Sequence, residues 1–150
     1  MNQQSQPLFA TKVVPFQPVL PLLDLTNVRH RVMKDHPDWT SERLEIAIQD
    51  YREFMALAKA MRGYKLVPTR DADQVWHAHL LHTRDYARFC MDYAGFFIHH
   101  SPKLPGEDAA HDEEELKTMR LHEQFFGKPH PVMVGVRQCS SSCTDDTPGK

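Results

Sequence analysis

Three histidines, two aspartates and one tryptophan lie within a twelve-residue segment of this 150-residue chain, between Asp71 and His82. The segment reads Asp-Ala-Asp-Gln-Val-Trp-His-Ala-His-Leu-Leu-His, and a second histidine pair, His99-His100, follows after a short interval. Imidazole and carboxylate groups bind transition metals and transfer protons near neutral pH. These residues predict where chemistry would take place, although their types name neither a reaction nor a substrate.

Helix geometry divides this segment between two faces. At about 100° per residue, Asp73 and His77 lie about 40° apart on one face. His79 and His82 lie on the opposite side of the same helix. A regular helix therefore cannot bring His77 and His79 to one metal ion. Two explanations stay open: the two histidines serve different partners, or the helix loosens after His77 and breaks near Leu81.

The pair formed by Asp73 and His77 is the strongest indication of a site. Trp76 and Leu80 flank the pair, and an acid and an imidazole on an apolar surface must be paired, hydrated or bound to a cation. If Asp73 binds one ring nitrogen of His77, the other nitrogen is oriented towards a metal ion or a proton. A transition-metal site needs three or four ligands, so others must come from elsewhere in the chain.

The His99-His100 pair can supply a further ligand. Alternate residues share a face in an extended segment, so His100 would point with Phe96 and Ile98, and we expect it to be the inward histidine. The candidate metal ligands are Asp73, His77, His79 and His100. Their chemistry favours Zn or Fe, either in a structural role or in support of a hydrolytic or oxidative reaction. The alternative is a structural polar cluster that only fixes the packing of the helices.

Established sequence motifs for catalysis or metal binding are absent. The chain contains no HExxH, CxxC or Glu-x-x-His pair, no GxSxG, and neither of the phosphate-binding patterns GxGxxG and GxxxxGK. Cys139 and Cys143 could chelate a soft metal or form a disulfide with a small loop, but a tail with incidental cysteines is the simpler interpretation. Cys90 lies in an apolar stripe and is interpreted as a core residue.

The elements that must position these residues are predicted to be helices. Alternating strand patterns are nearly absent, whereas apolar residues recur at three- and four-residue spacing between recognisable caps. The fold class is therefore all-α, a single small bundle of about five helices. The expected helices run from Asp24 or Thr26 to Lys34, from Thr40 or Ser41 towards Gly63, from Thr69 or Asp71 through the histidines, from an N-cap at Thr83 to Gly95, and from about Glu107 to Phe126.

The same periodicity predicts which side chains face the core. The second helix would direct Leu44, Ile48, Tyr51 and Met55 inwards, with Asp50 among the charged residues of its outer face. The last helix would direct Leu116, Met119, Phe125 and Phe126 inwards. His111, His122 and His130 are expected at helix or tail surfaces, although His122 shares a face with Met119.

The composition divides the chain into three parts and limits its partners. Residues 1–23 carry four prolines and form an expected extended arm, residues 24–127 form the helical domain, and residues 128–150 form an expected flexible tail. A net charge of −2 gives no reason to expect nucleic acid or a membrane as a partner, and a protein partner would meet the arm or the tail. Three cysteines and the absence of a signal peptide favour a cytoplasmic protein.

Several of these residues together resemble a known family. The pattern Asp71-x-Asp73-x-Val75-Trp76-His77-x-His79-x-Leu81, followed by Tyr86, Cys90 and Phe97-Ile98-His99-His100-x-Pro102, is similar to the glycine-rich domain-containing protein-like family. His36-Pro37-x-Trp39, the helix with Tyr51-x-x-Phe54, and Leu66-Val67-Pro68 look like its bacterial members. The resemblance covers roughly residues 36 to 102.

The resemblance implies a helical domain of unknown function with its aspartate and histidines clustered. It carries over onto Asp73, Trp76, His77, His79 and one histidine of the 99–100 pair. This chain lacks the long glycine-rich extension of the larger members, so a function located in that extension does not transfer. Two hypotheses follow: a domain with a divalent-metal or acid–base site, or a non-enzymatic module for protein interaction whose Asp/His/Trp cluster is structural.

Overall fold

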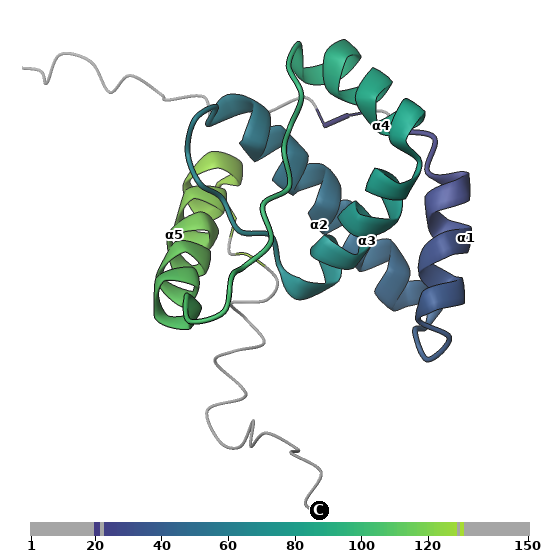
Figure 1. Ribbon diagram of the computed structural model, residues 1–150, viewed down its shortest axis with the longest axis horizontal. Coiled ribbons are helices and arrows are strands. Elements are labelled where there is room, and N and C mark those ends of the chain that lie inside the picture. Colours follow the sequence, from purple (N-terminus) through teal and green to yellow (C-terminus); the bar gives the residue numbers. More distant parts are fainter. Residues whose placement is uncertain (1–19, 22, 129, 131–150) are drawn as a thin grey trace, which may run out of the picture.

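The computed structural model describes residues 20–21, 23–128 and 130, and all the secondary-structure elements among them are helices (Figure 1). No strand occurs within these described ranges, so the predicted all-α bundle of about five helices is confirmed. The expected arm and tail fall largely outside them, as do Cys139 and Cys143. The elements are α1 (Thr26–Asp35), α2 (Ser41–Ala60), α3 (Arg70–Leu81), α4 (Thr83–Phe89), the π-helical turn η1 (Cys90–Ala94) and α5 (Asp108–Phe126).

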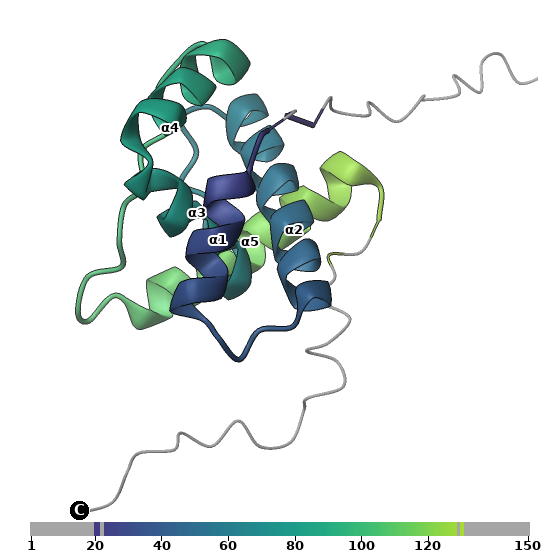
Figure 2. The ribbon, with the colours of Figure 1, turned by 90° about the vertical axis from the view of Figure 1, so that its right-hand side faces the viewer.

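Helix α2 is the centre of the bundle. It packs against α1, α3 and α5, and Figure 1 shows α1 and α5 on opposite sides of α2 and α3, while Figure 2 gives the same arrangement from the side. Thr40 begins the helix as an N-cap, because its hydroxyl accepts a hydrogen bond from the Arg43 amide at 3.1 Å. The chain then turns through Gly63, whose φ of +89° suits glycine.

The neighbours of α2 bury more of its surface than an amphipathic pattern predicts. The predicted core residues Leu44, Ile48, Tyr51 and Met55 are all buried, as expected. Asp50, however, was assigned to the outer face, and this prediction is wrong, since the residue is only 8% exposed. The reason is that α5 and the residues after it cover this side of α2 as well.

Helix α5 faces the core through a more polar stripe than we predicted. Met119 is buried, as expected, but Leu116 is 48% exposed, so its predicted inward position is wrong. Thr118 and His122 are buried beside Met119, and His130 beyond the helix is buried too. The surface positions predicted for His122 and His130 are therefore wrong, because carboxylates on α2 provide buried partners for both imidazoles.

The helix that carries the histidine segment ends where this segment ends. Helix α3 stops at Leu81 and α4 starts at Thr83, so the predicted break near Leu81 is confirmed, although the cap position falls on His82 rather than Thr83. Gly95, at φ +78°, ends η1. Residues 96–104 then return past α3 towards the start of α5 (Figure 1). This return brings the second histidine pair back to the first.

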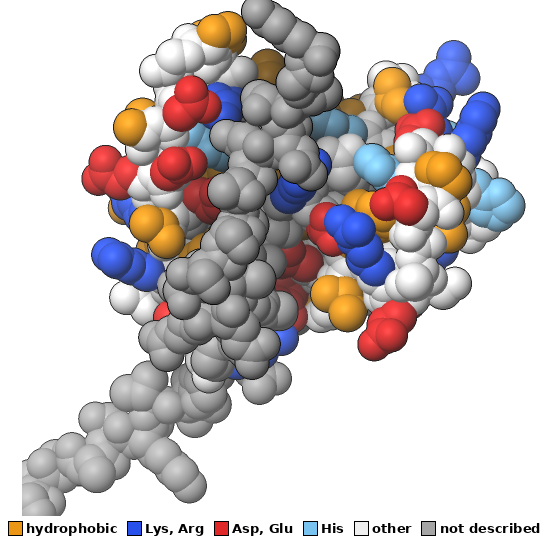
Figure 3. Space-filling view, turned by 90° about the horizontal axis from the view of Figure 1, so that it is seen from below, with side chains coloured by type: hydrophobic (Ala, Val, Ile, Leu, Met, Phe, Trp, Pro, Cys, Tyr) orange, Lys and Arg blue, Asp and Glu red, His pale blue; other side chains and the backbone are white. Residues whose placement is uncertain are grey.

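Charged side chains of both signs are interspersed over the face seen from below in Figure 3. This agrees with the small net charge of the chain. Among the residues the structure describes, every helix is too short or too polar to cross a membrane.

Candidate metal centre

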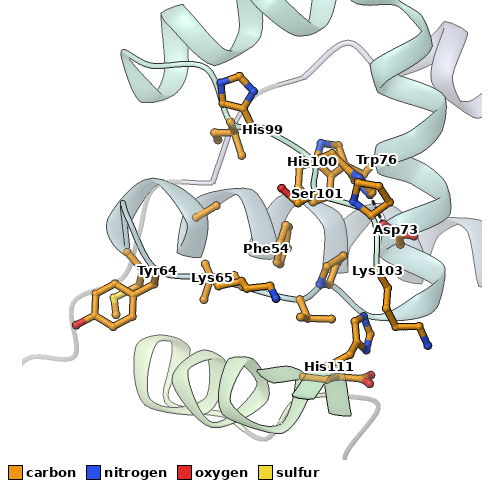
Figure 4. Close-up of a pocket in the computed structure, with 18 of the residues that line it drawn as sticks. Phe54, Tyr64, Lys65, Asp73, Trp76, His99, His100, Ser101, Lys103 and His111 are labelled. Carbon is orange, nitrogen blue, oxygen red and sulfur yellow. Dashed lines mark hydrogen bonds and ion pairs between the residues drawn. The ribbon is translucent and has the colours of Figure 1, made fainter. Parts of the chain in front are cut away.

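A groove of about 1330 Å³ separates α3 and the 96–104 segment from the loop after α2 and the start of α5 (Figure 4). Its floor is partly aromatic, with Phe54 from α2 and Trp76 from α3. Asp73, His77 and His100 belong to its wall, so the groove gives a ligand access to them.

The first turn of α3 fixes where its polar side chains point. Thr69 is the N-cap, and its hydroxyl accepts a hydrogen bond from the Ala72 amide at 3.3 Å. Asp73 and His77 follow one turn apart on the groove side, with 3.4 Å between the Asp73 Oδ2 and His77 Nε2 atoms. The predicted common face of these two residues is confirmed.

Tyr86 of α4 connects the returning segment, residues 96–104, to α3 through hydrogen bonds. Its hydroxyl accepts a hydrogen bond from Trp76 Nε1 at 2.9 Å and donates one to the carbonyl oxygen of Ile98 at 2.5 Å. Ile98 is thereby buried, and His100, two residues later, packs edge-on against the Trp76 ring with 4.4 Å between ring centroids. The alternation of the segment therefore turns His100 inwards, as predicted, and leaves His99 exposed beside Phe97.

Three potential ligand atoms converge at this point. His100 Nε2 lies 2.8 Å from Asp73 Oδ1 and 3.0 Å from His77 Nε2, and one ligand atom from each of the three residues lies within 4.8 Å of the others. The exposed fractions of the side chains are 28% for Asp73, 48% for His77 and 15% for His100. The group is thus embedded on the His100 side and open to solvent on the His77 side.

One carboxylate and two imidazoles in this arrangement can hold a divalent ion. An ion about 2 Å from each ligand needs ligand atoms about 3.3 Å apart, so a small expansion of the observed triangle is sufficient. Without an ion, two Nε2 atoms 3.0 Å apart hydrogen-bond only if one of them carries the proton. The same group could therefore share and transfer a proton.

His79 is not brought into this group. It is 3% exposed on the other side of α3, where its Nδ1 atom and the Tyr51 hydroxyl form a hydrogen bond of 2.7 Å. Burial, with a smaller contribution from His82, lowers the pKa of His79 to about 4 and keeps the ring neutral. Because the helix breaks only after His79, the break does not rotate this side chain to the groove.

Asp71, the first aspartate of the motif, also lies apart from the group. Its two carboxylate oxygens accept hydrogen bonds from Arg43 of α2 at 2.8 and 2.9 Å. A fork-to-fork pair of this kind joins the starts of α2 and α3. The polar residues of the Asp71–His82 segment are thus divided among three different surroundings.

Sequence reasoning missed two other groups of metal-ligating side chains. His111, Asp112 and Glu115 lie within about one turn of α5, and His111 and Glu115 line the far side of the groove. Their spacing was visible in the sequence, but exposed acidic groups of this kind are common on helices. Asp50, His122 and His130 converge in the interior, and no periodicity indicated that α2, α5 and a residue beyond α5 would meet there.

Comparison with protein families identifies the domain. A family model described as UCP032817-like matches residues 24–123, about two thirds of the chain. The chain belongs to the UCP032817-like family. The family is uncharacterised, which agrees with the expectation of a domain of unknown function. The match runs from just before α1 into α5, so the UCP032817-like domain contains all three residues of the groove cluster. No curated protein and no solved structure matches the chain.

Proposed function

We propose that the groove binds one divalent transition-metal ion, Zn²⁺ or Fe²⁺, through Asp73, His77 and His100, and that this ion would activate a water molecule for a hydrolytic reaction. The observation that carries the proposal is the convergence of three ligand atoms within 4.8 Å at the wall of a groove of about 1330 Å³. Three protein ligands with open positions are typical of catalytic Zn sites and of non-haem Fe(II) sites.

Each residue has a defined role in this proposal. His100 is held by the Trp76 ring and by the anchored Ile98, so it is the fixed ligand. His77 is the most exposed of the three and leaves the water and the substrate room on its side. A Zn²⁺ ion held by these residues would lower the pKa of its water and so would supply hydroxide near neutral pH. His79 is left out of the ligand set, because the Tyr51 hydroxyl already occupies its Nδ1 atom in the core.

The finer family resemblance supports the same residues. Asp73, Trp76 and His77 belong to the motif shared with the glycine-rich domain-containing protein-like family, and Trp76 contacts the ligand His100 directly. A cytoplasmic location and the absence of a nucleic-acid partner stay predictions from composition.

One observation favours a non-enzymatic interaction module instead. Asp73, His77 and His100 already lie within hydrogen-bond distance of one another, so the cluster can be satisfied without an ion. In that case its polar groups would only fix α3 against the returning segment, and a partner protein would bind elsewhere.

Metal analysis of the full-length protein separates the two functions. We expect a bound Zn or Fe ion that is lost in His77→Ala and in Asp73→Asn, and retained in the control His99→Ala, which removes the exposed histidine next to His100. Chelator-treated protein is supplied with Zn²⁺, or with Fe²⁺ under anaerobic conditions, before the measurement. A folded wild-type protein whose metal content after this treatment equals that of His77→Ala would rule the metal site out.

A further inference from the structure

The side of α2 that faces α5 encloses a second group of one aspartate and two histidines. Asp50 of α2, His122 of α5 and His130 beyond α5 are 8%, 3% and 3% exposed. One ligand atom from each lies within 4.8 Å of the others, and the two imidazole rings meet edge to face with centroids 4.4 Å apart. Three separate parts of the chain therefore bring metal-ligating groups to one interior point.

We propose that Asp50, His122 and His130 form a buried structural site for a single Zn²⁺ ion, which joins α2 and α5 to the segment that follows α5. This site is separate from the groove, and the proposal does not depend on the proposed function of Asp73, His77 and His100.

His122 presents the clearest sign of a ligand. Its Nε2 atom hydrogen-bonds the Glu53 carboxylate at 2.7 Å, whereas its buried Nδ1 atom has no hydrogen-bond partner within the described part of the chain. A carboxylate that holds one ring nitrogen fixes the tautomer and makes the other nitrogen a better metal ligand. A buried nitrogen without a partner costs free energy, and a metal ion at Nδ1 would remove that cost.

Asp50, like His122, is oriented by a hydrogen bond to a residue outside the group. Its Oδ2 atom accepts a hydrogen bond from the Thr69 hydroxyl, and its Oδ1 atom lies 2.8 Å from His130 Nε2. Thr69 also caps α3, so the same hydroxyl links the carboxylate to the start of that helix. An ion bound by Asp50 Oδ1 and His130 Nε2 would replace the proton of the hydrogen bond between these two atoms.

A small cavity lies among these residues. It measures about 10 Å³, about what one water-sized particle requires, and Asp50, Thr69, His122 and His130 line it. Apolar side chains such as Leu57 and Met119 form the rest of its wall. The cavity therefore has room for one ion and no room for a substrate.

The local charges favour a divalent cation. Asp50 and Glu53 are two buried carboxylates, and Lys128, which bonds Glu53 at 2.6 Å, is the one permanently charged basic group that the described structure places in this network. With neutral histidines the network is short of positive charge, and an unbalanced buried carboxylate is costly. The oxygen of Asp and the ring nitrogens of His are both among the ligands that Zn²⁺ takes, at about 2.0–2.2 Å.

The test uses the full-length chain in the His77→Ala background, so that the groove does not contribute. The protein is unfolded, refolded with Zn²⁺, passed through a desalting column and analysed for Zn. We expect about one Zn per chain and a raised midpoint of thermal unfolding relative to protein refolded with chelator. Adding His122→Gln should weaken Zn²⁺ binding at least about 100-fold, while the control His111→Gln on the same helix should retain the ion.

Each outcome decides the proposal. If His122→Gln does not fold, His130→Gln replaces it, since that residue lies outside the helices. A folded His77→Ala protein that retains no Zn, or that retains it in both His122→Gln and His130→Gln, overturns the buried site. A wild-type protein that loses all its Zn on His77→Ala supports the groove alone. A Zn ion that persists in His77→Ala and is lost in the buried variants supports the buried site, and the groove is judged separately by the difference in metal content between the wild type and His77→Ala.

Discussion

The groove cluster of Asp73, His77 and His100 and the buried cluster of Asp50, His122 and His130 each contain one aspartate and two histidines, in opposite surroundings. The groove residues are exposed or partly exposed, whereas all three residues of the interior group are buried. The surroundings, rather than the ligand types, therefore distinguish what each cluster can do. An open set of ligands can bind a substrate or a water molecule, and a closed one can only hold structure together.

The two clusters also differ in what supports them. In the interior, Glu53 holds His122 and Thr69 holds Asp50, so these two ligands each have a partner outside the cluster. Burial alone would raise the pKa of Glu53, but hydrogen bonds from His122, Lys128 and Gln49 outweigh it and lower the pKa to about 2. In the groove, the three residues mainly contact one another, and Trp76 provides support by packing.

The largest expected effect concerns the support of the interior cluster. Glu53→Ala removes a buried carboxylate and leaves His122 and Lys128 without their acceptor, so we expect the free energy of unfolding to fall by about 3–5 kcal/mol. Asp73→Ala in the groove should cost less than about 1 kcal/mol, since water can replace the lost partner. Urea denaturation of both variants in the presence of a chelator measures the difference. Equal losses in the two variants would mean that burial does not separate the clusters energetically.

A second expected effect is the pH dependence of stability, which should distinguish the two histidines of the Trp-His-x-His motif. His79 has a pKa of about 4 in the folded protein and about 6.5 when unfolded, so the unfolded chain takes up the proton first as the pH falls. The stability that depends on neutral His79 is complete above about pH 6.5 and is lost as the pH falls towards 4, by roughly 3 kcal/mol in all. Chelator-treated protein is measured by urea denaturation across this range.

Two matched variants assign this pH dependence. His79→Gln keeps an acceptor for the Tyr51 hydroxyl but cannot take up a proton, so its stability should fall less between pH 6.5 and 4. His77→Gln, which changes the exposed histidine of the same helix and leaves the contact between His79 and Tyr51 in place, is measured beside it for comparison. If both variants keep the full slope, another group is responsible for the pH dependence.

The sequence predicted the groove side of the molecule well because that prediction rested on one helix. The 100° rotation per residue placed Asp73 with His77, and the alternation of the returning segment selected His100 over His99. The candidate ligand His79, in contrast, lies outside the cluster on the other side of α3, as the same rotation indicates. Local geometry determines all of these relations. The sequence did not indicate the bond from Tyr86 to Ile98 that positions the segment, because it depends on how α4 packs.

The interior side could not be predicted in the same way. Asp50 and His122 look like surface residues in their own helices, and each is buried only because the other helix covers it. An amphipathic pattern describes one contact face per helix, whereas α2 has neighbours on several sides. His130 lies beyond the last helix, in a stretch whose composition suggested a tail, and its contact with Asp50 is a tertiary one. Polar pairs formed between distant segments leave no periodic signal in a single sequence.

The smallest expected change in stability gives the sharpest test of the groove. Asp71→Asn weakens an exposed pair with Arg43, so the free energy of unfolding should fall by less than about 1 kcal/mol and metal binding should be unchanged. Asp73→Asn should cost about as little in stability and yet lose the metal ion, because it removes a ligand rather than a contact between helices. Urea denaturation and metal analysis of the two variants measure both quantities. Loss of metal in Asp71→Asn as well would show that the Arg43 pair positions the first turn of α3, and with it the cluster, so that the two aspartates act together rather than separately.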